Sequence, residues 1–181
     1  HGFMPEDGLS RHEHTDRYPY REWCRDGYCT ATPGAVTENR FVAEWLKQNE
    51  RTHGWKAVKI AYDGHNASDL AISIAQERAD EDICVEVYQG CGTQNVAVKG
   101  FRDLLRQGLI VIKYSPAAVK WMANAVEYSN GNDECRLSKK YKDDTARIDP
   151  VAATMDALVL ALLRRNKPTL NDRINQGVWA M

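Results

Sequence analysis

Residues 147–161 read RIDPVAATMDALVLA, and this stretch decides the fold. Val151 and Met155 lie at helical spacing among further apolar residues, which predicts a buried helix. Pro150 suits the first turn of that helix, because the N–H that proline lacks would have no partner there. Asp149 is therefore expected at the N-cap, where a carboxylate accepts hydrogen bonds from backbone amides. A helix cap is the simplest interpretation of Asp149, and a second acid far upstream suggests another.

This second acid, Asp63, ends an apolar run. Val58, Ile60 and Tyr62 alternate with less apolar neighbours, which predicts a short strand, and a helical pattern follows Gly64. An acid at the carboxyl end of a strand lies where open α/β sheets bind ligands. Two carboxylates brought together there would repel each other unless a divalent cation neutralised them, and Mg²⁺ or Mn²⁺ prefers such oxygen ligands. The alternative for Asp63 is an ordinary turn residue.

Positive charge concentrates immediately before Asp149, in Arg136, Lys139, Lys140 and Lys142. A solvated surface loop is one interpretation of this group. The other is that these side chains bind DNA phosphates beside the carboxylates.

Two further residues near the acids are candidates for the same site. Asp156 follows Asp149 by about two helical turns and so shares its face of the helix. It is a candidate auxiliary metal ligand, although a partner for Arg147 or a solvated acid are simpler interpretations. His65 is a candidate for orienting water or phosphate, and its alternative is an exposed loop histidine.

The composition of the chain is that of an ordinary globular protein. Its 181 residues suffice for one domain with a substantial core, and its net charge of −1 neither supports nor excludes nucleic-acid binding. No apolar run is long enough to span a membrane, and no signal peptide is visible at the start. The five cysteines form no compact framework, which suggests reduced thiols. Cys24 and Cys29, with His12 and His14 nearby, match no strong zinc pattern.

Strand and helix patterns alternate along the chain, which predicts an α/β domain with a mixed sheet flanked by helices. We expect this domain to span residues 1–165, followed by a C-terminal tail at 166–181. Besides the strand before Asp63, the expected strands are 83–88, 109–112, a hairpin of 21–25 with 28–31, and a second hairpin around Tyr128 and Arg136.

Several short motifs occur in the order found in a known family. They are Phe3–Asp7, Tyr18–Trp23, Gly27–Gly34, Ile60–Asp63, Tyr88–Gly90, Asn95–Leu105, Trp121–Ala125 and Lys139–Ala153. Each motif is weak alone, but the joint match extends over nearly the whole chain up to about Arg165 and is specific. In these motifs the chain resembles the nuclease portion of the large terminase subunit of tailed bacteriophages.

This resemblance implies a ribonuclease H-like fold and a metal-dependent endonuclease that cuts concatemeric viral DNA. In that family, acids on the first strand, at the end of a later strand and near the start of a late helix hold two Mg²⁺ or Mn²⁺ ions. Asp63 matches the second of these positions and Asp149 the third. The first-strand acid belongs upstream of Phe3–Asp7, so we expect the chain to lack that strand and its acid, and to cut DNA poorly by itself.

The resemblance also implies partners and a location. They are double-stranded viral DNA, the small terminase subunit and the portal protein, in the host cytoplasm and without a membrane. An alternative of a different class is a non-catalytic DNA-binding or assembly module of the packaging motor. A related ribonuclease H-like recombinase or resolvase is a third hypothesis, which the N-terminal motifs disfavour.

Overall fold

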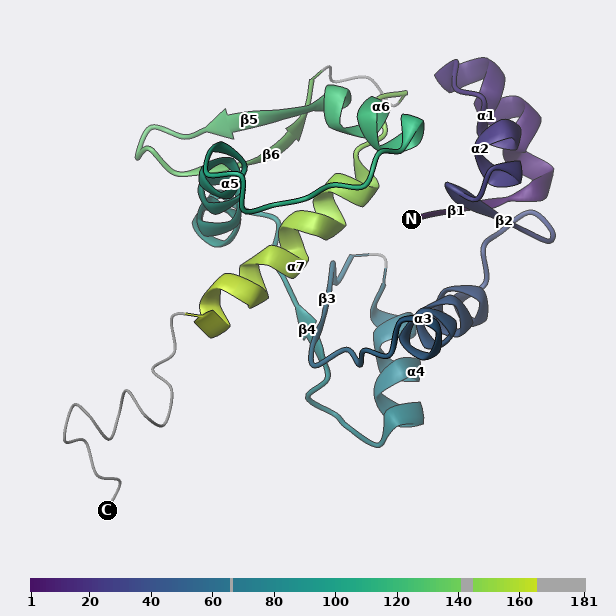
Figure 1. Ribbon diagram of the computed structural model, residues 1–181, viewed down its shortest axis with the longest axis horizontal. Coiled ribbons are helices and arrows are strands. Elements are labelled where there is room, and N and C mark those ends of the chain that lie inside the picture. The colour runs from purple at the N-terminus through teal and green to yellow at the C-terminus, as the bar shows by residue number, and fades with distance from the viewer. Residues whose placement is uncertain (66, 141–144, 166–181) are drawn as a thin grey trace.

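The computed structural model describes residues 1–65, 67–140 and 145–165. Three pairs of short strands lie beside helices in a mixed α/β arrangement, as Figure 1 shows. The predicted α/β class is therefore confirmed. The expected tail at 166–181 and Lys142 lie outside the described residues. In the part of the chain that is described, no helix combines the length and apolar character needed to cross a bilayer.

The helices and strands follow one another in a simple order. From the N-terminus they are β1 (Gly2–Pro5), the 3-10 turn η1 (Glu6–Gly8), α1 (Leu9–Asp16), α2 (Tyr20–Arg25), β2 (Cys29–Thr32), α3 (Asn39–His53), β3 (Ile60–Tyr62), α4 (Ser68–Arg78), β4 (Cys84–Glu86), α5 (Cys91–Arg106), α6 (Pro116–Asn124), β5 (Ala125–Ser129), β6 (Cys135–Lys139) and α7 (Asp149–Arg165).

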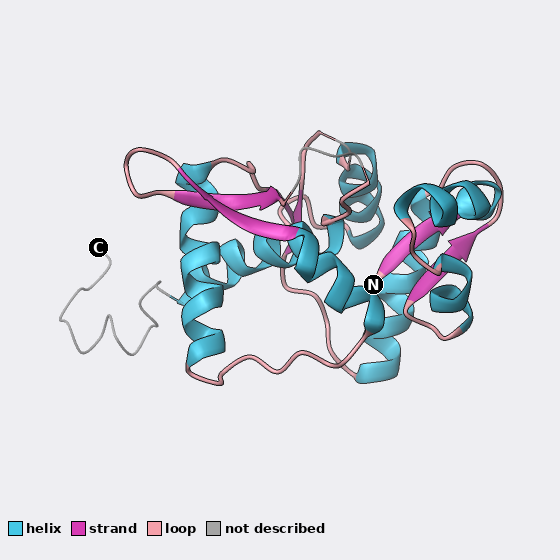
Figure 2. Ribbon diagram, turned by 90° about the horizontal axis from the view of Figure 1, so that it is seen from above, coloured by secondary structure: helices cyan, strands magenta, loops and turns pink. Residues whose placement is uncertain are grey.

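The strands pair two by two, and the two-stranded sheets formed by the N-terminal pair and by the hairpin are visible in Figure 2. β1 pairs with β2 and β3 with β4, both in parallel, so the chain crosses over between the partners of each pair. β5 and β6 form an antiparallel hairpin, which confirms the hairpin predicted around Tyr128 and Arg136.

Two predicted strands are wrong. Residues 21–25 belong to helix α2, because Tyr20 and Trp23, one helical turn apart, are both buried in a cluster of aromatic rings. Their burial on one helix face outweighs the local pattern that predicted a hairpin of 21–25 with 28–31. Residues 109–112 form no strand, and Val111 is 95% exposed. A short apolar run becomes a strand only where another strand is available to pair with it.

Helix α7 joins the two clusters of the hydrophobic core. Val151 packs in the first cluster with Trp23 and Trp121. Met155 and Val159 pack in the second cluster with Val87 and Ala97. Because the same helix contributes to both clusters, its position is fixed along several turns.

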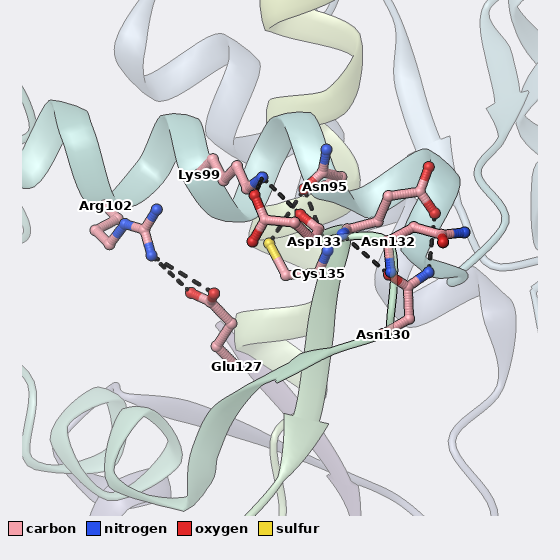
Figure 3. A network of polar contacts seen from close by, with 9 residues as sticks. Asn95, Lys99, Arg102, Glu127, Asn130, Asn132, Asp133 and Cys135 are labelled. Carbon is pink, nitrogen blue, oxygen red and sulfur yellow. Dashed lines mark hydrogen bonds and ion pairs between the residues drawn. The ribbon is translucent and has the colours of Figure 1, made fainter.

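Polar contacts attach the β5–β6 hairpin to α5, as Figure 3 shows. Lys99 donates to the carbonyl of Asp133 at 2.7 Å, and Arg102 forms an ion pair with Glu127 at 3.1 Å. The side-chain oxygen of Asn95 accepts the backbone N–H of Cys135 at 3.1 Å. These contacts hold β5, the turn of the hairpin and the start of β6 against α5.

Candidate active site

Asp63 lies at the carboxyl end of strand β3, directly after Tyr62. One oxygen of its carboxylate accepts the backbone N–H of His65 at 3.2 Å, and its carbonyl accepts the N–H of Ala67 at 3.2 Å. These bonds form the turn that leads into α4. The sequence places the acid here because the strand pattern stops where an aspartate can bond to the backbone two residues on.

Asp149 is the first residue of α7. The carbonyl of Ile148 accepts the N–H groups of Val151 and Ala152, both at 2.9 Å, so Ile148 occupies the N-cap position. The expectation of an N-cap at Asp149 is therefore wrong by one residue. No hydrogen bond joins the Asp149 carboxylate to a helix amide in the described part of the chain. Its charge still suits the first turn, since helix N-termini favour anions.

Asp156 lies further along α7 and is 97% buried, with 3% of its surface exposed. Its two carboxylate oxygens accept hydrogen bonds from the side-chain amides of Gln89 and Gln94, each at 3.1 Å. Burial raises the pKa of Asp156; the two amides oppose this shift, and the nearby charge of Asp63 adds to it. Both of its hydrogen-bond donors are neutral, which leaves the negative charge of Asp156 uncompensated by them.

One hollow of about 660 Å³ borders on all three acids. Asp63, Asp149 and Asp156 all line it, with Lys139 from the end of β6 and Gln89. The acids come from two segments far apart in the sequence, and the packing of α7 against β3 places them around the same space. A basic side chain beside carboxylates suits a ligand that carries phosphate and approaches a cation.

The remaining predicted site residues lie elsewhere. His65 is exposed in the turn after Asp63 and does not line the hollow. Arg136 packs over the ring of Tyr128 at 5.0 Å, on the opposite face of β6 from Lys139. Lys140 is exposed just past the end of β6. Lys142 lies in the part of the chain that the structure does not describe.

Two residues of the site, Gln89 and Gln94, were not anticipated. Gln94 is 1% exposed and lies one turn from the buried Ala97 on the inner face of α5. A polar residue at an apolar helix position was the available signal, because a buried amide needs a polar partner. Nothing in the spacing of Gln89 indicated that its partner is Asp156.

The carboxylates suit a divalent cation in their chemistry, but they do not lie close enough together to hold one as they stand. Mg²⁺ and Mn²⁺ prefer oxygen ligands, and all three acids supply them. A cation would also offset the repulsion between Asp63 and Asp156. Over residues 1–65, 67–140 and 145–165, however, no three His, Cys, Asp or Glu side chains gather closely enough to hold a metal ion. That finding includes the cysteines and histidines considered for zinc.

The architecture is that of a mixed α/β domain with acids around one hollow, consistent with a ribonuclease H-like fold. Residues 1–164 match the family described as terminase large subunit, endonuclease domain. The chain belongs to this family.

Comparisons with individual proteins agree with that assignment. Over 157 residues, or 83% of its length, the chain is 27% identical to the terminase large subunit of Enterobacteria phage HK97. It also superposes on the crystal structure of the HK97 bacteriophage large terminase with a TM-score of 0.74, at 25% identity and over 87% of the chain. The chain spans 29% of the first relative and 32% of the second.

Proposed function

We propose that this chain is a metal-dependent endodeoxyribonuclease domain that cuts concatemeric viral DNA during packaging. The observation that supports the proposal is that Asp63, Asp149 and Asp156 line one hollow together with Lys139. Membership of the terminase endonuclease family supports the same activity. In this proposal the partners are double-stranded DNA and, for a full-length large subunit, the small terminase subunit and portal protein. The host cytoplasm remains the predicted location.

Asp63 and Asp149 would hold Mg²⁺ or Mn²⁺ in a two-metal site, with Asp156 as an auxiliary ligand. When bound, such ions activate water for attack on a phosphodiester and stabilise the leaving oxygen. Lys139 would attract a DNA phosphate into the hollow, which lowers the repulsion between the DNA and the acids. Gln89 and Gln94 hold Asp156 in one orientation, so that its oxygens need no rearrangement.

A second candidate is a non-catalytic DNA-binding or assembly module. The finding that favours it is that, among the described residues, no three His, Cys, Asp or Glu side chains lie close enough together to hold a metal ion. In this case the acids would serve packing and solubility, while Arg136, Lys139, Lys140 and Lys142 would bind DNA without cutting it. Salt-sensitive DNA binding is expected from both candidates, so only cleavage separates them.

The test is nicking of supercoiled plasmid in Mn²⁺, with EDTA added to a matched sample. It should be run on this chain and, where the gene encodes a longer protein, on that protein as well. We expect chelator-sensitive nicking that is weak for the chain alone, and its loss in Asp63→Asn and Asp149→Asn. Cutting that survives EDTA, or that both variants retain, would contradict the proposed metal site. DNA binding without nicking by either protein would support the second candidate instead.

A further inference from the structure

Asp16 is a buried acid outside the hollow. Its side chain is 0% exposed, and it is the last residue of α1. The carbonyl end of a helix disfavours negative charge, so an aspartate here is locally unfavourable. Its oxygen Oδ1 is also buried, with no hydrogen-bond partner among the residues that the structure describes. A well-packed apolar residue would stabilise the fold at least as well at such a position. The role of Asp16 therefore lies in the residues that it binds.

The contacts of Asp16 lead to the start of α7. Its oxygen Oδ2 accepts a hydrogen bond from the hydroxyl of Tyr20 at 2.8 Å and another from Nε of Arg147 at 3.0 Å. Arg147 precedes Asp149 by two residues. One carboxylate oxygen therefore ties α1 and α2 to the segment that delivers Asp149.

The backbone of Arg147 is held as well as its side chain. The side-chain amide of Asn124 donates to the carbonyl of Arg147 at 3.0 Å, and also to the hydroxyl of Tyr18 at 2.8 Å. The carbonyl of Asn124 in turn accepts the backbone N–H of Lys140 at 2.6 Å. Arg147 is thus held by both its side chain and its backbone carbonyl. Little freedom therefore remains for Asp149, two residues further along the chain.

Asp149 and Arg147 also share their surroundings. Both line a second hollow of about 630 Å³ beside β1, while Asp149 lines the acid hollow too. Any movement of residues 147–149 would therefore shift the Asp149 carboxylate relative to Asp63. The hydrogen bond from Arg147 to Asp16 is charge-assisted, the class of hydrogen bond that resists such movement best.

We propose that Asp16, acting through Arg147, is a positioning residue that fixes the Asp149 carboxylate for cation binding. The inference rests on the proposed function, because it takes Asp149 to be a ligand. Groups that orient metal ligands typically change affinity by about 10- to 100-fold when they are replaced. Asp16→Asn keeps the shape of the side chain and removes its charge, so Mn²⁺ affinity should fall about tenfold.

The test measures Mn²⁺ binding directly, from the EPR signal of free Mn²⁺ as protein is added, and needs no cleavage. The variants are Asp16→Asn and Arg147→Gln. Arg147 is partly exposed, so its variant keeps the test open if Asp16→Asn does not fold. Glu50→Gln is the matched control: it breaks a largely buried ion pair with Arg78, at 3.0 Å, that lines neither hollow.

We expect all three variants to lower the melting temperature, and only Asp16→Asn and Arg147→Gln to weaken Mn²⁺ binding. Unchanged affinity in both of these variants would overturn the positioning role. An equal loss in Glu50→Gln would overturn it too, since the effect would then follow general stability. If the wild-type chain showed no Mn²⁺ binding that Asp149→Asn removes, the proposed function itself would fall, and this inference with it.

Discussion

The side-chain amide of Gln94 donates a hydrogen bond of 3.1 Å to Oδ1 of Asp156, deep between α5 and α7. The oxygen of the same amide accepts the backbone N–H of Leu137 on β6, also at 3.1 Å. One buried side chain therefore connects an acid of the hollow to the strand that ends in Lys139. The hairpin and Asp156 are parts of a single polar network, although they are far apart in the sequence.

Gln94→Leu should destabilise the protein by about 1–3 kcal/mol, because it leaves a buried carboxylate oxygen and a backbone N–H without partners. Chemical denaturation measures the loss. Gln48→Leu is the control, since Gln48 donates only to Thr52 on the exposed side of α3 and should change stability by less than about 0.5 kcal/mol. Equal effects of the two substitutions would show that the Gln94 network contributes nothing of its own.

Asp156 should make stability depend on pH. Burial raises its pKa above the value of about 3.9 for an aspartate in an unfolded chain, so the folded state binds the proton more tightly. This contribution to stability is complete below about pH 4 and is lost as pH rises through the folded-state pKa. The free energy of unfolding of the wild type, relative to Asp156→Asn, should therefore fall as pH rises above about 4. Guanidinium titrations without divalent metal measure it, and a flat or rising difference would argue against the shift.

Asp149→Asn in the full-length protein should abolish cleavage while leaving the melting temperature nearly unchanged. Asparagine keeps the size of the side chain and removes the charge that a cation requires. Asp69→Asn is the matched control, because Asp69 also lies in the first turn of a helix, α4, but outside the hollow. It should retain full cleavage. Wild-type cleavage by Asp149→Asn would return this acid to a structural role at the start of α7.

Lys139→Ala and Arg136→Ala should affect DNA differently, because the two side chains lie on opposite faces of β6. Lys139 lines the acid hollow, so its loss should reduce both cleavage and DNA binding. Arg136→Ala should weaken binding alone, and each variant should lower the slope of log affinity against log salt by about one. Fluorescence anisotropy across a salt series, beside plasmid nicking, separates the effects. If Arg136→Ala lost more cleavage than Lys139→Ala, Arg136 and not Lys139 would be the basic residue that acts at the acids.

Elements with strong local signals could be predicted from the sequence. Ser115-Pro116 predicts a helix start, and the hydroxyl of Ser115 accepts the N–H of Ala118 at 3.2 Å at the start of α6. The run after Pro150 predicts α7 for the same kind of reason. These residues specify their structure through hydrogen bonds to near neighbours in the chain. Such short-range patterns can be recognised from the sequence alone.

Elements that depend on distant partners could not be predicted. Helix α2 forms where Tyr20 and Trp23 meet Tyr18 and Trp121, and no local pattern reveals that Trp121 will be there. The candidate site also has a part that could be predicted from the sequence and a part that could not. Its acids stand out at a strand end and a helix start, whereas the pairing of Gln94 with Asp156 across 62 positions depends on how α5 and α7 pack.

Helix α7 turns Val151, Met155 and Val159 inward to the core and presents Asp149 and Asp156 to the hollow. The two sets are kept apart only by their phase around the helix axis. Inserting a single residue between the two acids would rotate everything beyond it by about 100°, turning Asp156 away from the hollow and Met155 out of the core. Single substitutions at the other positions of this helix leave its two faces in place. An insertion or deletion between the acids does not. Gaps in this interval should be rarer among descendants of the gene than substitutions at the other positions of the helix.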